Sequence, residues 1–365
     1  MIYLDSAATS LQKPAQVTSA MVEAVKSLGN PGRGAHSHSL DASKCVYQGR
    51  KTIASFFGAA PQQVVFTAGA TESLNIAISG LLKPADHVIT TVYEHNSVLR
   101  PLYSLGAALS IVKEISCCHL KPNTKAVVIT HASNLTGQIL DLQAASKFCK
   151  KHGLLLIVDA AQTAGLIPLN IKDMDVLCFT GHKSLLGPQG IGGLVVGRDI
   201  NITPTKFGGS GTDSFSKTQP GKLPESLEAG TLNTPGIAGL TAGIEYICRT
   251  GMENMYESAL KLAKLFHEGV AATRGVKIYS GLDAANMPIV ALNIGNMDSA
   301  MVEFNLSNKY GISTRGGAHC APLLHKLLGT EEQGAVRFSF SSFNTEAEVQ
   351  AAIKAVDEIA RGDHI

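Results

Sequence analysis

Short β-rich runs alternate with stretches of helical periodicity through the first 200 residues, and this alternation constrains the fold more than any other feature. The helical stretches include 71–82 and 142–152. Strand and helix repeated in this order predict an α/β fold, in which a mainly parallel sheet is covered by helices on both faces. The six expected strands lie at 63–67, 87–91, 126–130, 154–159, 176–180 and 193–197.

The pattern changes after about residue 235 and predicts a second lobe. A chain of 365 residues is too long for one small core, so we predict a large α/β domain over 15–240. A smaller α+β domain is expected over 241–365, together with the N-terminal segment 1–14. Residues 208–230 are rich in Gly, Ser and Thr and predict a mobile loop or a segment that faces a second subunit. The helices and strands expected in the second lobe lie at 237–273, 276–279, 289–294, 299–310, 336–340 and 346–361.

Charge and cysteine content argue against several classes of protein. With 31 basic and 29 acidic residues the net charge is +2, so neither nucleic acid nor an anionic membrane is an expected partner. The apolar run 154–158 is too short to cross a bilayer, and the opening MIYLDSAATS lacks the features of a secretory signal. Seven scattered cysteines without metal-site spacing predict free thiols in a reducing compartment, the cytoplasm.

Polar residues gather where the expected strands end. They are the segment 67–71, the pair Glu94-His95, Asn134, Asp159 and the segment 180–183. In a parallel sheet, ligands bind beyond the carboxyl ends of the strands. We therefore expect these residues to form one shared site.

Asp159 and Lys183 have the most distinctive settings in this group. Asp159 ends the apolar run LLLIV, where a carboxylate costs desolvation energy unless a cation such as a pyridinium nitrogen meets it. Lys183 follows an expected strand in the segment TGHKS. A lysine in a partly apolar pocket loses its proton more easily and can form a Schiff base. The alternatives are a helix-capping Asp and a solvated loop lysine.

The segment TAGATES (67–73) joins an expected strand to a helix. Backbone amides at the helix N-terminus and the hydroxyl of Thr71 would suit a phosphate, although a simple Thr cap explains the same residues. His95 follows the next strand, where it stacks on an aromatic ring or is a polar loop residue. The segment 67–73 therefore predicts an anion site only in combination with the other polar residues at the strand ends.

Two further candidates come from the second lobe. Cys320 stands in TRGGAHCAP beside His319 and near Arg315, and its thiol is expected to be exposed and reactive unless it is a buried packing residue. Arg337, in VRFSFSSFNT, alternates as a strand that points one Arg toward the cleft, where it suits a planar carboxylate. A surface salt bridge is the alternative for Arg337. The other six cysteines, including the adjacent pair Cys117-Cys118, are interpreted as packing residues.

Taken together, these motifs resemble the class V, fold-type I pyridoxal-phosphate (PLP) enzymes, and among them the cysteine desulfurases and selenocysteine lyases. The likeness runs from YLDSAATS near the start to Asn344-Thr345, with five separate motifs in the family's order. It implies a seven-stranded-type sheet, PLP as cofactor and L-cysteine or L-selenocysteine as substrate. It also implies a homodimer with shared active sites.

The resemblance implies a role for each matching residue. Lys183 would carry PLP and act in catalysis, and Asp159 would pair with the ring nitrogen. Cys320 would be the nucleophile that takes sulfur as a persulfide, and His95 would stack over the ring. Further cofactor contacts would come from Ala70, Thr71, Gln162, Thr180 and His182, and from Thr231 of a neighbouring subunit. The substrate would be bound by Asn134, Arg337, Arg33 and His36.

The expected function is that of a cysteine desulfurase, which converts L-cysteine to L-alanine and leaves a persulfide on Cys320 for an acceptor. The stretch between Cys320 and Arg337 is compact, which resembles the Suf-type branch, whose members pass sulfur to a dedicated acceptor protein. The chain departs from the family where Thr180 replaces a common Ser, Gly32 a common His, and EHNS a common EHHA. There are three alternatives. The first is a selenocysteine lyase, and the second is another class V PLP enzyme, an aminotransferase or β-lyase, in which Cys320 is not catalytic. The third is a non-catalytic sulfur-relay or scaffold subunit.

Overall fold

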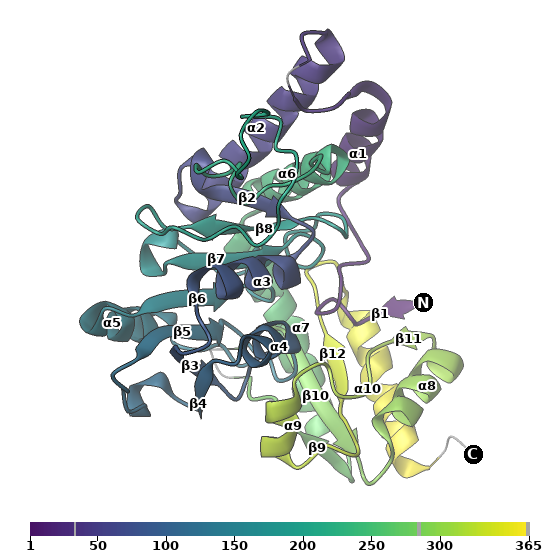
Figure 1. Cartoon of the computed structure of the whole chain (residues 1–365). Coiled ribbons are helices and arrows are strands. Elements are labelled where there is room, and N and C mark those ends of the chain that lie inside the picture. The colour runs from purple at the N-terminus through teal and green to yellow at the C-terminus, as the bar shows by residue number, and fades with distance from the viewer. Residues whose placement is uncertain (33, 283–285, 363–365) are drawn as a thin grey trace.

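The computed structural model describes residues 1–32, 34–282 and 286–362, apart from the side chain of Cys117. Its largest element is a seven-stranded sheet with the order β2-β8-β7-β6-β5-β3-β4 (Figure 1). β8 runs antiparallel to β2 and β7, and the other neighbouring pairs are parallel, so the predicted sheet is confirmed. The strands are Val64–Thr67 (β2), His87–Thr91 (β3), Ala108–Val112 (β4), Thr124–Thr130 (β5), Leu155–Asp159 (β6), Val176–Thr180 (β7) and Gly192–Val196 (β8).

Helices bury both faces of this sheet, as its apolar strands require. One face packs against α3 (Ala70–Leu81) and α4 (Asn96–Leu105), which contribute Leu74 and Leu102 to the core. The opposite face packs against three helices, and α1 (Ala15–Ser27) packs on one of them, α6. The three are α2 (Ser37–Phe57), α5 (Leu142–His152) and α6 (Thr234–Thr250).

Capping side chains and glycines explain where individual helices begin and end. At the start of α5, the carboxylate of Asp141 accepts a hydrogen bond from the backbone N–H of Ala144 at 2.9 Å. The same helix ends at Gly153, which has a φ of +64°. Such a left-handed conformation suits glycine, because no Cβ is present to clash.

The C-terminal residues form a smaller α+β lobe around an antiparallel sheet with the order β12-β10-β9. Its strands are β9 (Val276–Ile278), β10 (Ile289–Ile294) and β12 (Val336–Ser339). The apolar core beneath the sheet includes Phe266 and Phe338. The helices of the lobe are α7 (Met252–Ala271), α8 (Ser299–Tyr310), α9 (Pro322–Leu328) and α10 (Glu346–Arg361).

The N-terminal segment joins this C-terminal lobe. β1 (Ile2–Tyr3) pairs in parallel with β11 (Ile312–Ser313), and Leu4 is fully buried in the core of the lobe. In contrast, α6 packs in the core of the large sheet as far as Ile247. We therefore propose that the large domain ends near Gly251, where α6 stops, rather than at residue 240.

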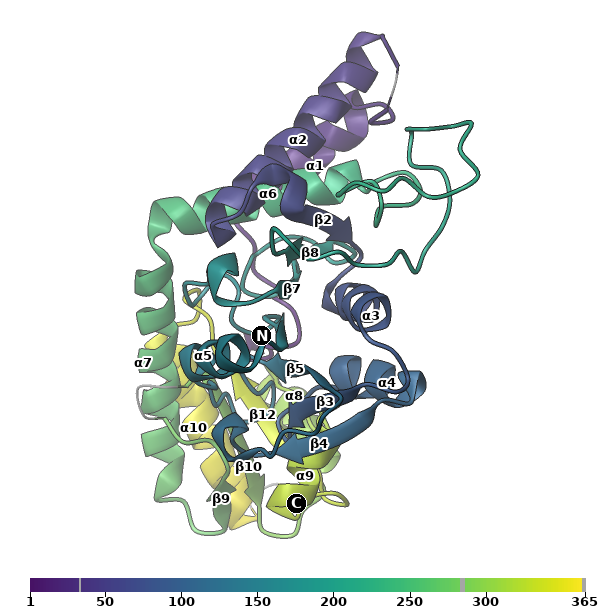
Figure 2. The same ribbon diagram turned by 60° about the vertical axis from the view of Figure 1, so that its left-hand side comes forward.

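Residues 201–233 connect β8 to α6 without a helix or strand. Figure 2 shows this green segment extending away from the sheet beside α2. One end is fixed by Glu228, which forms a buried ion pair with Arg50 of α2 and accepts a hydrogen bond from the backbone N–H of Phe66 at 2.7 Å. The segment is therefore anchored to the edge of the sheet near α6, while its middle is exposed.

Candidate active site

A cavity of about 960 Å³ opens at the carboxyl ends of β5, β6 and β7 and is lined by both lobes. The large sheet and its helices form one wall, and residues 315–316 and 319–320 form part of the other. The structure thus brings together residues that are far apart in the sequence. The predicted site residues that line the cavity are Ala70, Thr71, His95, Asn134, Asp159, Gln162, Thr180, His182, Lys183, Cys320 and Arg337.

Asp159 and Lys183 reach the cavity from neighbouring strands. Asp159 is the last residue of β6 and is buried, and its Oδ1 accepts a hydrogen bond from the backbone N–H of Ala161 at 2.9 Å. Burial raises the pKa of the Asp159 carboxyl. Burial also lowers the pKa of the Lys183 ammonium to about 8, although the negative charge of Asp159 opposes this change. An appreciable fraction of Lys183 is therefore unprotonated near neutral pH.

The N-terminus of α3 and the first turn of α4 line one part of the cavity. The hydroxyl of Thr71 lies 2.8 Å from the hydroxyl of Ser97, which belongs to the first turn of α4. Gly69 precedes the helix, and a Cβ at this position would lie only 3.3 Å from Oγ1 of Thr180. Backbone N–H groups and hydroxyls that converge at a helix N-terminus favour a phosphate or another anion.

His182 lines the cavity and is fixed through hydrogen bonds to its backbone. The hydroxyls of Thr9 and Ser10 both donate to its carbonyl oxygen at 3.1 Å. Burial lowers the pKa of the imidazole to about 4, so the ring is neutral. Among the described residues no group hydrogen-bonds the buried Nδ1. This nitrogen is free to contact a bound group.

His95 is the N-cap of α4, and this role fixes its tautomer. Its Nδ1 accepts a hydrogen bond from the backbone N–H of Ser97 at 3.0 Å, which leaves Nε2 to carry the proton of a neutral ring. Burial, aided by the positive charge of Lys183, lowers the pKa of His95 to about 4. A neutral, oriented imidazole at the cavity wall suits stacking on a flat ring.

Cys320 is exposed, as predicted, while the backbone around it is tethered. Its carbonyl oxygen accepts a hydrogen bond from the N–H of Asn96 at 2.8 Å, and the carbonyl of His319 accepts one from Nδ2 of Asn134 at 2.7 Å. His319 and Cys320 have φ values of +49° and +55°. Two consecutive non-glycine residues in this region are strained, so the surrounding contacts hold the backbone of residues 319–320 in place.

Arg337 lies in β12 and is 2% exposed. Its Nη1 donates to the carbonyl oxygen of Asn134 at 2.8 Å, and its Nη2 pairs with Oδ1 of Asp5 at 2.8 Å. Arg315 pairs with the other carboxylate oxygen of Asp5 at 3.4 Å. Asp5 was not among the predicted site residues, and Arg315 was expected only as a neighbour of Cys320.

Three predicted site residues are not among those that line the cavity. His36 is exposed, and its ring accepts a hydrogen bond from the N–H of Ser39 at 3.3 Å as the N-cap of α2. Thr231 is exposed on the segment that precedes α6. Arg33 lies outside the described residues. The roles of these three residues stay predictions. For Thr231 the prediction is a contact with the cofactor of a neighbouring subunit.

The remaining cysteines differ in their surroundings. Cys149 and Cys178 are buried and Cys45 and Cys118 are partly buried, as packing residues would be, but Cys248 is exposed, so that interpretation was wrong for it. Within the described ranges, no cluster of three His, Cys, Asp or Glu side chains is placed to hold a metal ion. No helix in those ranges is long and apolar enough to span a membrane.

Comparison with known proteins gives consistent relatives. The sequence matches the family model described as Aminotransferase class-V over residues 2–352. A probable cysteine desulfurase of Methanothermobacter thermautotrophicus is 33% identical, and the match covers 98% of this chain and 94% of that protein. A cysteine desulfurase of Salmonella agona is 31% identical over 99% of this chain and 94% of its own length.

Solved structures agree with these relatives. The apo structure of cysteine desulfurase from Thermococcus onnurineus NA1 has a TM-score of 0.89 and 34% identity, and covers 99% of this chain and 95% of that chain. The cysteine desulfurase CsdA from Escherichia coli has a TM-score of 0.85 and 29% identity, with coverage of 98% and 94%. The whole fold, including both lobes, is therefore shared with these proteins.

Proposed function

This enzyme belongs to the class V aminotransferase family and is related over nearly its whole length to cysteine desulfurases, and we propose that it removes sulfur from L-cysteine with PLP as cofactor. The overall reaction converts L-cysteine and the Cys320 thiol into L-alanine and a Cys320 persulfide. The two sides contain the same atoms, so no external oxidant is needed.

The proposal rests chiefly on one observation, the convergence of four unlike groups on a single cavity. These are the buried carboxylate of Asp159, the amine of Lys183 with its lowered pKa, the exposed thiol of Cys320 and the buried guanidinium of Arg337. A general base, a nucleophile and a carboxylate-binding cation are what desulfuration of an amino acid requires. Each group alone has a structural explanation, but their combination favours catalysis.

The residues present fit PLP. The end of α3 with Thr71, together with the unpartnered Nδ1 of His182, would hold the phosphate. A buried carboxylate with a raised pKa calls for a cationic partner, and the ring nitrogen would be that partner for Asp159. When bound, PLP supplies an electron sink for the substrate's α-carbon. Further contacts are proposed for Ala70, His95, Gln162, Thr180 and Lys183.

Lys183 is assigned the proton transfers. With a pKa of about 8, its amine accepts the proton of the substrate's α-carbon and, as an ammonium, returns a proton when alanine forms. Asp159 favours the ammonium form, whereas the positive charges of Arg337 and Arg315 favour the neutral amine. The opposing charges keep Lys183 able to act in both directions near neutral pH.

Cys320 is assigned the attack on sulfur. As a thiolate, Cys320 forms a bond to the substrate sulfur, and the carbon–sulfur bond of the substrate breaks. The electron pair of the broken bond passes to the β-carbon of the substrate, which then takes a proton. The hydrogen bonds from Asn96 and Asn134 to the backbone of residues 319–320 hold the thiol at the cavity. A fixed nucleophile shortens the search for the reactive geometry.

Arg337 is proposed to bind the carboxylate of the substrate, and Asn134 is proposed to make a supporting contact. The amide Nδ2 of Asn134 is already used by the carbonyl of His319, and its buried Oδ1 has no partner within the described part of the chain. An oxygen of this kind accepts hydrogen bonds and does not suit a carboxylate. We therefore propose that Oδ1 of Asn134 accepts a hydrogen bond from an N–H or O–H group of the bound substrate or cofactor.

A homodimer with shared active sites is part of the proposal. Thr231 is exposed, near the anchored end of the segment 201–233, which also exposes Phe207 and Phe215. Exposed aromatic side chains of this kind are often covered by a second subunit. We also propose a dedicated sulfur-acceptor protein, as in the Suf-type branch, and a cytoplasmic location, which the free cysteines support.

The test is alanine formation from L-cysteine by the purified, PLP-loaded protein in the presence of a reductant. The parent should form alanine, and Lys183→Ala and Cys320→Ala should not. Cys248→Ala is the matched control, because this exposed cysteine is not among the residues that line the cavity. Full activity of Cys320→Ala would overturn the persulfide, and no alanine from the parent would overturn the proposed activity. The same assay with selenocysteine compares the two substrates.

A further inference from the structure

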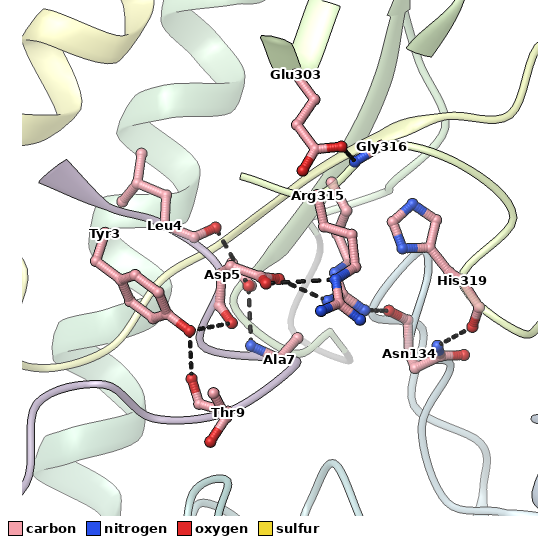
Figure 3. A network of polar contacts seen from close by, with 12 residues as sticks. Tyr3, Leu4, Asp5, Ala7, Thr9, Asn134, Glu303, Arg315, Gly316 and His319 are labelled. Carbon is pink, nitrogen blue, oxygen red and sulfur yellow. Dashed lines mark hydrogen bonds and ion pairs between the residues drawn. The ribbon is translucent and has the colours of Figure 1, made fainter. Parts of the chain in front are cut away.

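Asp5 pairs with two arginines that line the cavity, Arg315 and Arg337, and Figure 3 shows Asp5 in contact with Arg315. One carboxylate oxygen pairs with Nη2 of Arg337 at 2.8 Å and the other with Nε of Arg315 at 3.4 Å. The Asp5 and Arg337 side chains are 11% and 3% exposed, whereas Arg315 is 53% exposed. The contact with Arg337 is therefore the one shielded from water, where an ion pair fixes geometry most strongly.

The backbone on both sides of Asp5 is fixed to the strand that carries Arg337. The N–H of Ser339 in β12 donates to the carbonyl of Leu4 at 2.8 Å, and the N–H of Ala7 donates to the hydroxyl of Ser339 at 2.9 Å. The carboxylate is thus delivered by a rigid segment and not by a loose N-terminus. A side chain held in this way can orient its partner with little freedom.

The guanidinium of Arg337 keeps part of its hydrogen-bonding capacity unused. It has five N–H donors, of which one on Nη1 is used by the carbonyl of Asn134 and one on Nη2 by Asp5. Its Nε is buried and has no partner among the residues that the structure describes. Because Arg337 lines the cavity, a carboxylate that binds there finds unsatisfied donors already in place.

We propose that Asp5 is a positioning residue. It fixes the guanidinium of Arg337, which in turn binds the carboxylate of the substrate. This inference rests on the proposed function for the identity of the substrate. Asp5 and Asn134 hold the guanidinium from two directions, so that its remaining N–H groups are presented to one carboxylate. Preorganisation of this kind raises affinity because the side-chain entropy is lost on folding and not on binding.

Charge supports the same assignment. One carboxylate shared by two guanidinium groups leaves an excess of one positive charge in this cluster, which a single substrate carboxylate can neutralise. Glu303 also lines the cavity, but its carboxylate accepts a hydrogen bond from the N–H of Gly316 at 2.9 Å. Figure 3 shows Glu303 on the side of Arg315 that is away from Asp5.

The experiment compares ligands with and without a carboxylate. Calorimetry of the PLP-loaded protein measures the binding of L-alanine and of L-alaninamide, which lacks the carboxylate. In Asp5→Ala, L-alanine should bind about tenfold more weakly, equivalent to about 1.4 kcal/mol, while L-alaninamide changes by less than about twofold. The KM for L-cysteine should rise by about tenfold with kcat changed by less than about threefold, because binding that is equal in ground and transition states is lost.

Two further variants separate positioning from folding. Asp5→Asn keeps the shape and one oxygen acceptor for Nη2, so it should bind L-alanine more weakly than the parent, by less than the tenfold expected for Asp5→Ala. This comparison with the parent remains possible if Asp5→Ala does not fold. Tyr3→Phe removes the hydroxyl that donates to the backbone carbonyls of Thr9 at 2.8 Å and of Asp5 at 3.3 Å, but it leaves the Asp5 carboxylate intact, so its affinity should be unchanged.

Three results would overturn the inference. They are equal losses for L-alanine and L-alaninamide, tighter binding of L-alanine by Asp5→Asn than by the parent, or a loss in Tyr3→Phe as large as in Asp5→Ala. Failure of the parent to form alanine from L-cysteine concerns the proposed function instead. Calorimetry requires no turnover, so the two failures are distinguishable.

Discussion

Removal of one partner of the buried ion pair between Arg50 and Glu228 should be strongly destabilising, because the other charge then stays buried without its counter-ion. The two side chains are 10% and 6% exposed, and Arg50 also donates to the carbonyl of Val64. Glu228→Ala leaves the guanidinium buried without its counter-ion, so we expect a loss of ~3–5 kcal/mol in the free energy of unfolding. The exposed pair Lys44–Asp41, with exposures of 77% and 53%, should contribute less than ~1 kcal/mol.

Urea denaturation followed by far-ultraviolet circular dichroism measures both values, since the chain has no tryptophan for fluorescence. Asp41→Ala is the matched control for Glu228→Ala. The double replacement of Arg50 by Met and Glu228 by Leu should recover most of the loss, because it removes both charges from the interior. The reasoning is refuted if Glu228→Ala costs no more than Asp41→Ala, or if the double variant is as unstable as the single one.

Further predictions concern the cavity. In the cofactor-free protein, the reactivity of Lys183 toward an amine reagent should rise as the pH rises through about 8, because the neutral amine reacts. Asp159→Asn should move this profile to lower pH, since it removes a charge that favours the ammonium; a midpoint near 10.5 in the parent would contradict the burial of Lys183. Iodoacetamide should modify Cys320 long before Cys149, whose pKa burial raises to about 12, as mass spectrometry of the folded protein would show. Equal rates would exclude the exposed placement of Cys320. Asn134→Ala removes a hydrogen bond to the Cys320 loop worth ~1 kcal/mol, so hydrogen exchange at 316–321 should accelerate by up to about fivefold, and unchanged rates would mean that other contacts hold the loop.

The regular part of the fold was predictable because burial on both faces of a sheet leaves a strong apolar signal. The strand His87–Thr91 and the helices Leu142–His152 and Glu346–Arg361 begin and end as predicted. The edge strand β4 was missed, since none of its five residues is buried, two are exposed and Ser110 interrupts its apolar run. The predicted helix over 237–273 is interrupted at Gly251, whose φ of +90° ends α6.

The site was predictable where its residues stand at the ends of strands. Asp159 and Lys183 are marked by the apolar runs before them, and their meeting at one cavity follows from the parallel sheet. His36 could not be assigned in this way, because a histidine before a helix serves equally well as its N-cap. Asp5 was missed because nothing near it in the sequence indicates Arg337 as its partner.

The contact between Asp5 and Arg337 also determines when the site can exist during synthesis of the chain. The two residues are separated by 332 positions, so at 5–20 residues per second roughly 17–66 s pass between their appearance on the ribosome. Loop closure over this distance requires β12 to be in place. A chain that ends before β12 contains all seven strands of the large sheet, but it lacks the arginine proposed to bind a substrate carboxylate. On this proposal, the nascent protein cannot bind that carboxylate before β12 has been made.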